Sequence, residues 1–205
     1  MDNIRDSFGI RLRRGFAPVI STLHRLGVTP NQVTVAGTLL NAGVAVLIVT
    51  DNLIWAGILV LIAGIFDMLD GTLARVAQQV TPFGAFLDST LDRVSEGIVL
   101  AAIAYHLALE GGTGGAVDAG LVVLALLGSI LVSYTRARAE TLGVECKVGI
   151  MSRPERIILV AIGLFFNVLP YAIYVMLALT TFTVIQRVVH TYRELGKAKG
   201  TGRIR

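Results

Sequence analysis

Six long apolar stretches divide the chain, and most of its charged residues lie between them or at their ends. A helix needs roughly 20 apolar residues to cross the ~30 Å hydrocarbon core of a bilayer. Several stretches reach that length only if the charged segments 67–75 and 88–96 continue the same helices. The pattern therefore predicts an all-α membrane protein with six transmembrane helices. Their apolar parts are residues 33–50, 53–66, 97–109, 119–134, 157–169 and 171–185.

The segment before the first apolar stretch is amphipathic. Within residues 3–26, apolar side chains at positions 8, 12, 16, 19, 20 and 23 follow helical spacing, with arginines among them. This spacing predicts an N-terminal amphipathic helix. The helix either lies in the membrane interface or packs on the cytosolic side of the membrane domain. No apolar run of seven or more residues precedes Val33, so the segment does not resemble a signal peptide.

Three parts of the chain follow from this pattern. Residues 1–32 form a cytoplasmic juxtamembrane segment, and residues 33–193 form one membrane domain. Residues 194–205 form a basic cytoplasmic tail, which we expect to be disordered from residue 196 onward. The glycine-rich segment 111–115 is expected to be a flexible loop on the outer side of the membrane.

Charge distribution supports the topology. Charged residues make up 16% of the chain, against about 25% in a typical soluble domain. None of the 18 Lys and Arg residues lies in the turns at 50–52, 110–118 and 167–170. Six spans with cytoplasmic termini put every basic residue on one side, as the positive-inside rule requires. We expect a multi-pass protein of the cytoplasmic (inner) membrane, whose basic isoelectric point reflects topology and not nucleic-acid binding.

Two pairs of aspartates lie at the ends of the second and third predicted spans. Asp67 and Asp70 are three residues apart and Asp88 and Asp92 are four apart, so each pair shares one helix face. The link 76–83 is short, which predicts antiparallel neighbouring helices whose aspartates face each other. An ionised aspartate at membrane depth costs at least ~2.5–3.5 kcal/mol, so four of them need compensating positive charge.

Two divalent cations would balance the four carboxylates. The nearby arginines, Arg75 and Arg93, are too few to do so, and carboxylate oxygens suit Mg²⁺, Mn²⁺ or Ca²⁺ better than zinc or copper. Paired hard cations commonly stabilise the attacking and leaving oxygens of phosphoryl displacement. Gly71 and Ala74 leave a bare helix surface that a phosphate or nucleotide can approach.

Two other interpretations of the aspartates stay open on these residues alone. In the first, the carboxylates pair with arginines only for packing. In the second, they mark the pathway of an ion or proton transporter. Transporter sites usually lie near the bilayer midplane, whereas these aspartates lie at cytoplasmic helix ends.

The spacing of this segment resembles the signature of the CDP-alcohol phosphatidyltransferases. That family takes a lipid from a CDP-linked donor, here CDP-diacylglycerol or CDP-archaeol, joins it to an alcohol and releases CMP. The resemblance also implies two metal ions, a homodimer, and an active site open to the cytosol and the inner leaflet. The matching residues read Asp67-x2-Asp70-Gly71-x2-Ala74-Arg75-x8-Gly84-x3-Asp88-x3-Asp92.

The resemblance implies a role for each matching residue. Asp67, Asp70 and Asp88 are implied to bind metal. Asp92 is implied to bind metal and also to deprotonate the acceptor hydroxyl as general base. The residues implied to contact the CDP-lipid are Asn31, Thr34, Gly71, Ala74 and Arg75.

A set of arginines bears on the choice of acceptor alcohol. Arg136, Arg153, Arg156 and Arg187 are predicted to lie at similar depth, beside the carboxylates. An arginine cluster suits an acceptor that carries a phosphate. The alternative is that these arginines anchor helix ends in anionic lipid headgroups.

Two segments resemble those of phosphatidylinositol-phosphate synthases and their archaeal counterparts. They are residues 133–140 and 153–156, and the first has Arg136 where those enzymes often have lysine. The resemblance implies inositol 1-phosphate as acceptor, bound by the four arginines. Glycerol 3-phosphate is the alternative, since it also brings a phosphate to a basic pocket.

Overall fold

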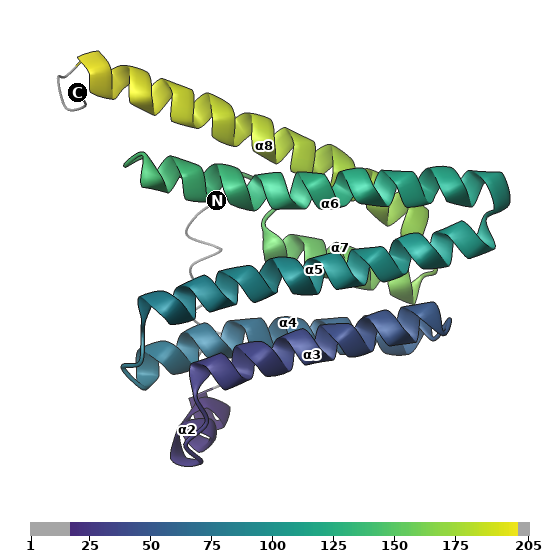
Figure 1. The fold of residues 1–205 in the computed structure, drawn as a ribbon, viewed down its shortest axis with the longest axis horizontal. Helices are drawn as coiled ribbons and strands as arrows, with labels where there is room; N and C mark the ends of the chain where they lie inside the picture. The colour runs from purple at the N-terminus through teal and green to yellow at the C-terminus, as the bar shows by residue number, and fades with distance from the viewer. Residues whose placement is uncertain (1–16, 201–205) are drawn as a thin grey trace.

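The computed structural model describes residues 17–200, and every regular element in this range is an α-helix. Helices α3 to α8 run back and forth along roughly one common direction, and α2 lies across their end (Figure 1). We call the end with α2, the α4–α5 link and the last turns of α8 the terminal end, and the other the distal end. The helices are α2 (Ala17–Arg25), α3 (Pro30–Val49), α4 (Leu53–Val76), α5 (Pro82–Glu110), α6 (Gly112–Thr141), α7 (Arg153–Phe165) and α8 (Leu169–Gly200).

Six helices, α3 to α8, correspond to the six predicted apolar stretches, so the all-α prediction is confirmed for the described residues. The predicted stretch 157–169 runs past the end of α7 at Phe165. Four of them, α3, α4, α6 and α8, are long and apolar enough to cross a membrane. The 13 residues of α7 span about 20 Å at 1.5 Å per residue, less than the hydrocarbon core. Helix α5 is long, but its first half is charged. The count of six spans therefore stays a prediction.

The charged segments 67–75 and 88–96 do continue helices α4 and α5, as expected. Helix α4 is followed by Gln78, whose φ of +54° is incompatible with a continuing helix. Helix α5 begins after Thr81, whose hydroxyl accepts a 3.0 Å hydrogen bond from the Gly84 amide and so caps the first turn. Both aspartate pairs thus lie on regular helices near the terminal end.

Two expected flexible segments are helical instead. Gly111 alone separates α5 from α6, and residues 112–115 form the first turn of α6. A side chain at Gly111 would come within 2.6 Å of the Gly115 backbone, so this tight reversal requires glycine. At the other end α8 continues to Gly200, through the first part of the predicted tail.

The described part of the N-terminal segment packs on the membrane domain. Ile20 of α2 is buried against Val33, Leu69 and Leu73 of α3 and α4. Residues 1–16, which carry positions 8, 12 and 16 of the predicted amphipathic helix, lie outside the described residues. The contact of this segment with lipid stays a prediction.

Helix α3 packs against both α4 and α5, whereas α4 and α5 barely contact each other. The expectation that these two helices are directly packed neighbours is therefore wrong, because α3 separates them over most of their length. Helix α7 packs on α4 and α8, and residues 142–152 lead back from α6 so that α7 begins part-way along the bundle (Figure 1).

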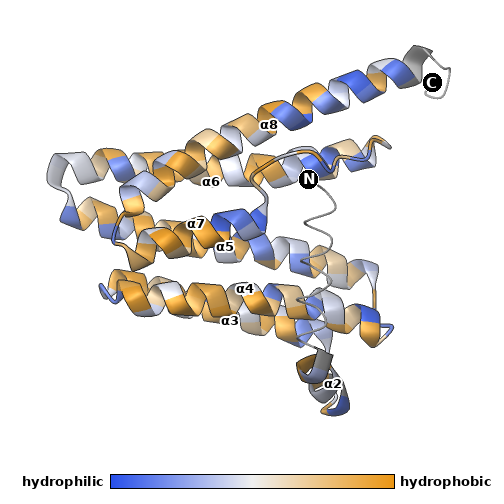
Figure 2. Ribbon diagram, turned by 180° about the vertical axis from the view of Figure 1, so that it is seen from behind, coloured by the Kyte–Doolittle hydropathy of each residue, from blue (hydrophilic) through white to orange (hydrophobic). Residues whose placement is uncertain are grey.

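The surface of the bundle is largely apolar. Large side chains such as Leu39, Trp55 and Val123 are more than 60% exposed, which is unusual for a monomeric soluble protein and expected for helices that face lipid. Figure 2 shows apolar residues through the middle of the helices and hydrophilic residues toward their ends, including the start of α7.

Candidate active site

Helix α3 supports the aspartates of α4. Asp70 is buried and accepts a 2.8 Å hydrogen bond from the Thr34 hydroxyl and another from the Gly71 amide. A side chain at Gly37 would lie 3.4 Å from Oδ1 of Asp67, so the backbone of α3 approaches this carboxylate closely. Thr34 and Gly37 therefore fix the positions of the two carboxylates from the neighbouring helix.

Helix α5 presents a row of three acids. Asp88, Asp92 and Glu96 recur every four residues and share one face. The carboxylate of Asp88 interacts electrostatically with those of Asp67 and Asp70. The two predicted aspartate pairs therefore meet across a gap, although their helices do not pack together.

Arg153, the first residue of α7, bridges this gap. One Nη atom lies 2.7 Å from Oδ2 of Asp67, and the other makes an ion pair with Asp92. Arg153 is held there because Ser152 caps the helix, with Glu155 accepting a 3.1 Å hydrogen bond from the Ser152 amide. An acid on α4 and an acid on α5 are thereby linked through α7.

Arg156 lies one turn further along α7 and is 3% exposed. Its Nε and Nη2 atoms lie 2.5 and 2.9 Å from the two carboxylate oxygens of Glu96. This is the bidentate geometry that arginine forms with carboxylates. Helix α7 is thus joined to α5 at two levels, by Arg153 and by Arg156.

A cavity of about 460 Å³ opens beside these pairs. All four arginines that the sequence places beside the carboxylates line it. Its lining holds five guanidinium groups and four carboxylates, so its formal charge is slightly positive. The charged lining residues are Asp88, Asp92, Arg93, Glu96, Arg136, Glu140, Arg153, Arg156 and Arg187.

Arg187 differs from the other arginines of the cavity. It is 5% exposed, and it donates hydrogen bonds to the backbone oxygens of Val148, at 3.0 Å, and Val132. Within residues 17–200 it makes no ion pair, whereas Arg136 is paired with Glu140 at 2.9 Å. A buried charge without an opposite charge is costly, so Arg187 is the arginine best suited to an anionic ligand.

The residues predicted to contact the CDP-lipid lie outside the lining of this cavity. Asn31 faces α5, because a side chain at Gly84 would lie 3.3 Å from its Oδ1. Arg75 is exposed, and its Nη2 lies 3.4 Å from Oγ1 of Thr72. The aspartates contact both regions, since Asp70 accepts a hydrogen bond from Thr34 on α3 and Asp88 and Asp92 line the cavity.

Sequence reasoning missed Glu96 and Ser152 as lining residues of the cavity. The signal for Glu96 was present, since it extends the four-residue spacing of Asp88 and Asp92 by one step. Ser152 carried no comparable signal, because its position depends on where the 142–152 connection returns to the bundle.

The sequence model of the CDP-alcohol phosphatidyltransferase family matches residues 27–189, which include every helix from α3 to most of α8. The chain belongs to the CDP-alcohol phosphatidyltransferase family. It is therefore a transferase of phospholipid biosynthesis and a multi-pass membrane protein, and the transporter alternative falls away.

Several relatives of this phosphatidyltransferase share most of its length. It is 40% identical over 175 residues to an archaetidylinositol phosphate synthase of Pyrococcus horikoshii, with 85% of this chain and 89% of the relative covered. It is 41% identical over 179 residues to a phosphatidylinositol phosphate synthase of Corynebacterium glutamicum, with 84% and 81% covered.

Solved structures resemble it as a whole. The phosphatidylinositol phosphate synthase of Mycobacterium tuberculosis with CDP-DAG bound superposes with a TM-score of 0.77 at 30% identity, covering 85% of this chain and 92% of that one. A structure of the same enzyme in complex with manganese and citrate gives a TM-score of 0.78 at 30% identity, covering 85% and 88%.

Proposed function

We propose that this phosphatidyltransferase transfers the phosphatidyl or archaetidyl group of a CDP-linked lipid to inositol 1-phosphate and releases CMP. The observation that carries the proposal is the arginine-lined cavity beside Asp88 and Asp92, in which buried Arg187 makes no ion pair with a described residue. An acceptor phosphate would supply that missing anion. The two curated relatives named above, both inositol-phosphate lipid synthases, support the same acceptor.

Divalent cations fit the four aspartates. All the donor atoms are carboxylate oxygens, as Mg²⁺ and Mn²⁺ prefer. Oδ2 of Asp67 is buried and lies 2.7 Å from Arg153, but it has no hydrogen bond of acceptable geometry among the described residues. We propose that Asp67, Asp70, Asp88 and Asp92 hold two such ions. Bound there, the ions would neutralise the charge that develops on the transferred phosphoryl group. The manganese in the Mycobacterium tuberculosis enzyme supports this assignment.

The protein's own residues supply the general base and the groups that orient the acceptor. The acceptor hydroxyl attacks the lipid-side phosphorus, its proton passes to Asp92, and the bond from that phosphorus to the CMP oxygen breaks. Arg153, Arg156, Arg136 and Arg187 orient the acceptor through its phosphate. A carboxylate beside cations is a weak base, so close positioning of the hydroxyl supplies much of the rate.

The donor is proposed to lie on the other side of the aspartates. Asn31, Thr34, Gly71, Ala74 and Arg75 lie on α3 and α4, outside the lining of the acceptor cavity, and Arg75 offers the positive charge for a diphosphate. The CDP-DAG complex of the Mycobacterium tuberculosis enzyme supports a donor of this kind. Reaction would then occur between two substrates that approach the aspartates from opposite sides.

We also propose the membrane topology, the location and the dimeric state of the enzyme. Six spans, cytoplasmic termini and a cytoplasmic site follow from the basic residues at the terminal end. Inner-membrane location and a homodimer follow from the family resemblance and the topology. Cross-linking in membranes, with labels placed at the terminal and distal ends, tests both the dimer and the orientation.

Purified enzyme should release CMP from CDP-diacylglycerol or CDP-archaeol only when inositol 1-phosphate and Mg²⁺ or Mn²⁺ are present. Asp92→Asn should abolish release while the protein keeps its thermal unfolding temperature. CMP release with glycerol 3-phosphate and none with inositol phosphate would overturn the acceptor assignment, and full turnover by Asp92→Asn would exclude Asp92 as the base.

A further inference from the structure

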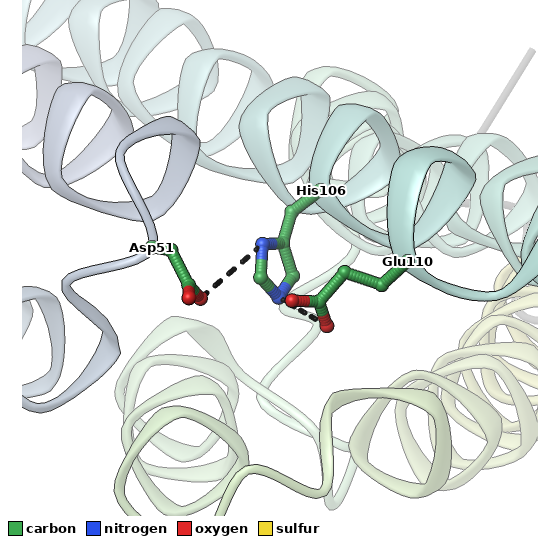
Figure 3. Close-up of side chains that lie close together, drawn as sticks. All are labelled: Asp51, His106 and Glu110. Carbon is green, nitrogen blue, oxygen red and sulfur yellow. Dashed lines mark ion pairs between the residues drawn. The ribbon is translucent and has the colours of Figure 1, made fainter.

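Three titratable side chains meet at the distal end, far from the aspartates. Asp51 lies in the turn between α3 and α4, and His106 and Glu110 lie one turn apart near the end of α5 (Figure 3). We propose that these three residues form a second metal site, for one divalent transition-metal ion such as Zn²⁺ or Co²⁺. Nothing in the transfer reaction requires this site.

The three side chains lie close enough together to share one ion. One nitrogen of His106 and one carboxylate oxygen from each acid all lie within 4.8 Å of one another. Nε2 of His106 is 3.2 Å from Oε2 of Glu110, and Nδ1 is 4.0 Å from Oδ1 of Asp51. Ligands about 2.0–2.2 Å from a zinc ion are separated by about 3.5 Å in a tetrahedron. The two acids lie beside different ring nitrogens, so an ion bound to Nε2 together with Glu110 requires the exposed Asp51 side chain to turn toward that nitrogen.

The environment of the histidine also favours a bound metal. His106 is 5% exposed, and among the described residues its Nε2 has no hydrogen bond of acceptable geometry, although it points toward the Glu110 carboxylate (Figure 3). A buried imidazole nitrogen normally has a hydrogen-bond partner or a metal. Asp51 and Glu110 are exposed, so an ion can reach the site from solution.

The backbone places Asp51 where the site needs it. Asp51 has a φ of +59°, in the left-handed region that aspartate tolerates better than most residues. The turn 50–52 thereby brings the end of α3 against the last turn of α5. An ion held by all three residues would tie this turn to α5.

The donor set distinguishes this site from the aspartates at the terminal end. One imidazole and two carboxylates favour Zn²⁺ or Co²⁺, whereas four carboxylates favour Mg²⁺ or Mn²⁺. Asp92 and His106 are fourteen residues apart on α5, or about 21 Å along the helix. The two sites can therefore be filled and measured separately.

The competing explanation is an ion pair between His106 and Glu110 that needs no metal. To separate the two, metal-stripped enzyme in detergent is dialysed against Zn²⁺ with excess Mg²⁺, and bound zinc is counted. We expect about one zinc ion per chain, and at least tenfold weaker binding in Asp51→Asn and in Glu110→Gln. Asp118→Asn, which changes a half-buried acid at the same end, should bind zinc as the parent does.

Two further measurements keep the test independent of folding and of catalysis. Zinc at saturating concentration should raise the unfolding temperature of the parent by roughly 5 °C and leave that of Asp51→Asn unchanged. Asp88→Asn, altered only at the terminal end, should keep its zinc. Zinc that is lost in Asp88→Asn but retained in Asp51→Asn and Glu110→Gln, or no bound zinc at all, would overturn the proposal.

Discussion

The buried guanidinium of Arg156 is held by both carboxylate oxygens of Glu96, through hydrogen bonds of 2.5 and 2.9 Å. This pair joins α7 to α5 and also holds Arg156 in the lining of the acceptor cavity. Among the predicted phosphate-binding arginines, Arg156 and Arg187 thus have opposite surroundings, since no described carboxylate pairs with Arg187 within 4.0 Å.

Glu96→Gln should destabilise the protein strongly. It leaves the Arg156 charge buried without a counterion, which costs about 3 kcal/mol. Glu140→Gln, which breaks the exposed pair with Arg136, should cost less than about 1 kcal/mol. Unfolding temperatures of both variants in one detergent measure the difference, and equal shifts would show that the Arg156 pair is not a structural link.

Arg187→Gln should act mainly on the acceptor. We expect a rise of at least tenfold in the KM for inositol phosphate, because a charged hydrogen bond to the phosphate is lost, with little change in the KM for the CDP-lipid. Arg138→Gln changes an exposed arginine on α6 outside the cavity and serves as the control. If both variants behave like the parent, the arginines bind lipid headgroups and not the acceptor.

Thr34→Val should weaken the response to divalent cations. The variant removes the 2.8 Å hydrogen bond that positions the Asp70 carboxylate, and such a bond to a charged group contributes about 1.5–3 kcal/mol. The concentration of Mg²⁺ that gives half-maximal CMP release should rise roughly tenfold. In Thr50→Val, at the distal end of α3, it should not change. An unaltered Mg²⁺ requirement in Thr34→Val would remove Thr34 from the support of the site.

Gly128→Ala should loosen the contact between α6 and α8. The added methyl group would lie 2.5 Å from Oγ1 of Thr180, which is fully buried, and such overpacking costs about 1–3 kcal/mol. Gly120→Ala, on the same helix, meets no atom of another described residue outside its own helix turn within 4 Å and should be neutral or slightly stabilising. The unfolding temperatures of the two variants measure the difference. An unchanged unfolding temperature in Gly128→Ala would show that moving α6 and α8 apart at this contact does not destabilise the protein.

Periodicity predicted most of the fold because apolar stretches of this length have one stable form in a membrane. It also predicted that the charged ends of α4 and α5 stay helical, which places Asp67 and Asp92 on opposite sides of one gap. It did not predict that α3 separates the two helices, since packing partners depend on contacts between distant segments. The shortness of α7 likewise depends on the path of residues 142–152.

The candidate site was predictable in part for the same reason. The aspartates share one short segment, and the four-residue spacing that joins Asp88 to Asp92 also contains Glu96. At the distal end, the spacing of His106 and Glu110 is visible in the sequence, but Asp51 lies more than fifty residues away. Only the folded turn between α3 and α4 brings it beside them.

Direct competition between acceptors tests the central claim. Purified enzyme is given CDP-diacylglycerol, Mg²⁺ and equal concentrations of inositol 1-phosphate and glycerol 3-phosphate, and the lipid products are identified by mass spectrometry. The account predicts phosphatidylinositol phosphate as the dominant product, with CMP formed in equal amount. Phosphatidylglycerol phosphate as the dominant product would contradict it.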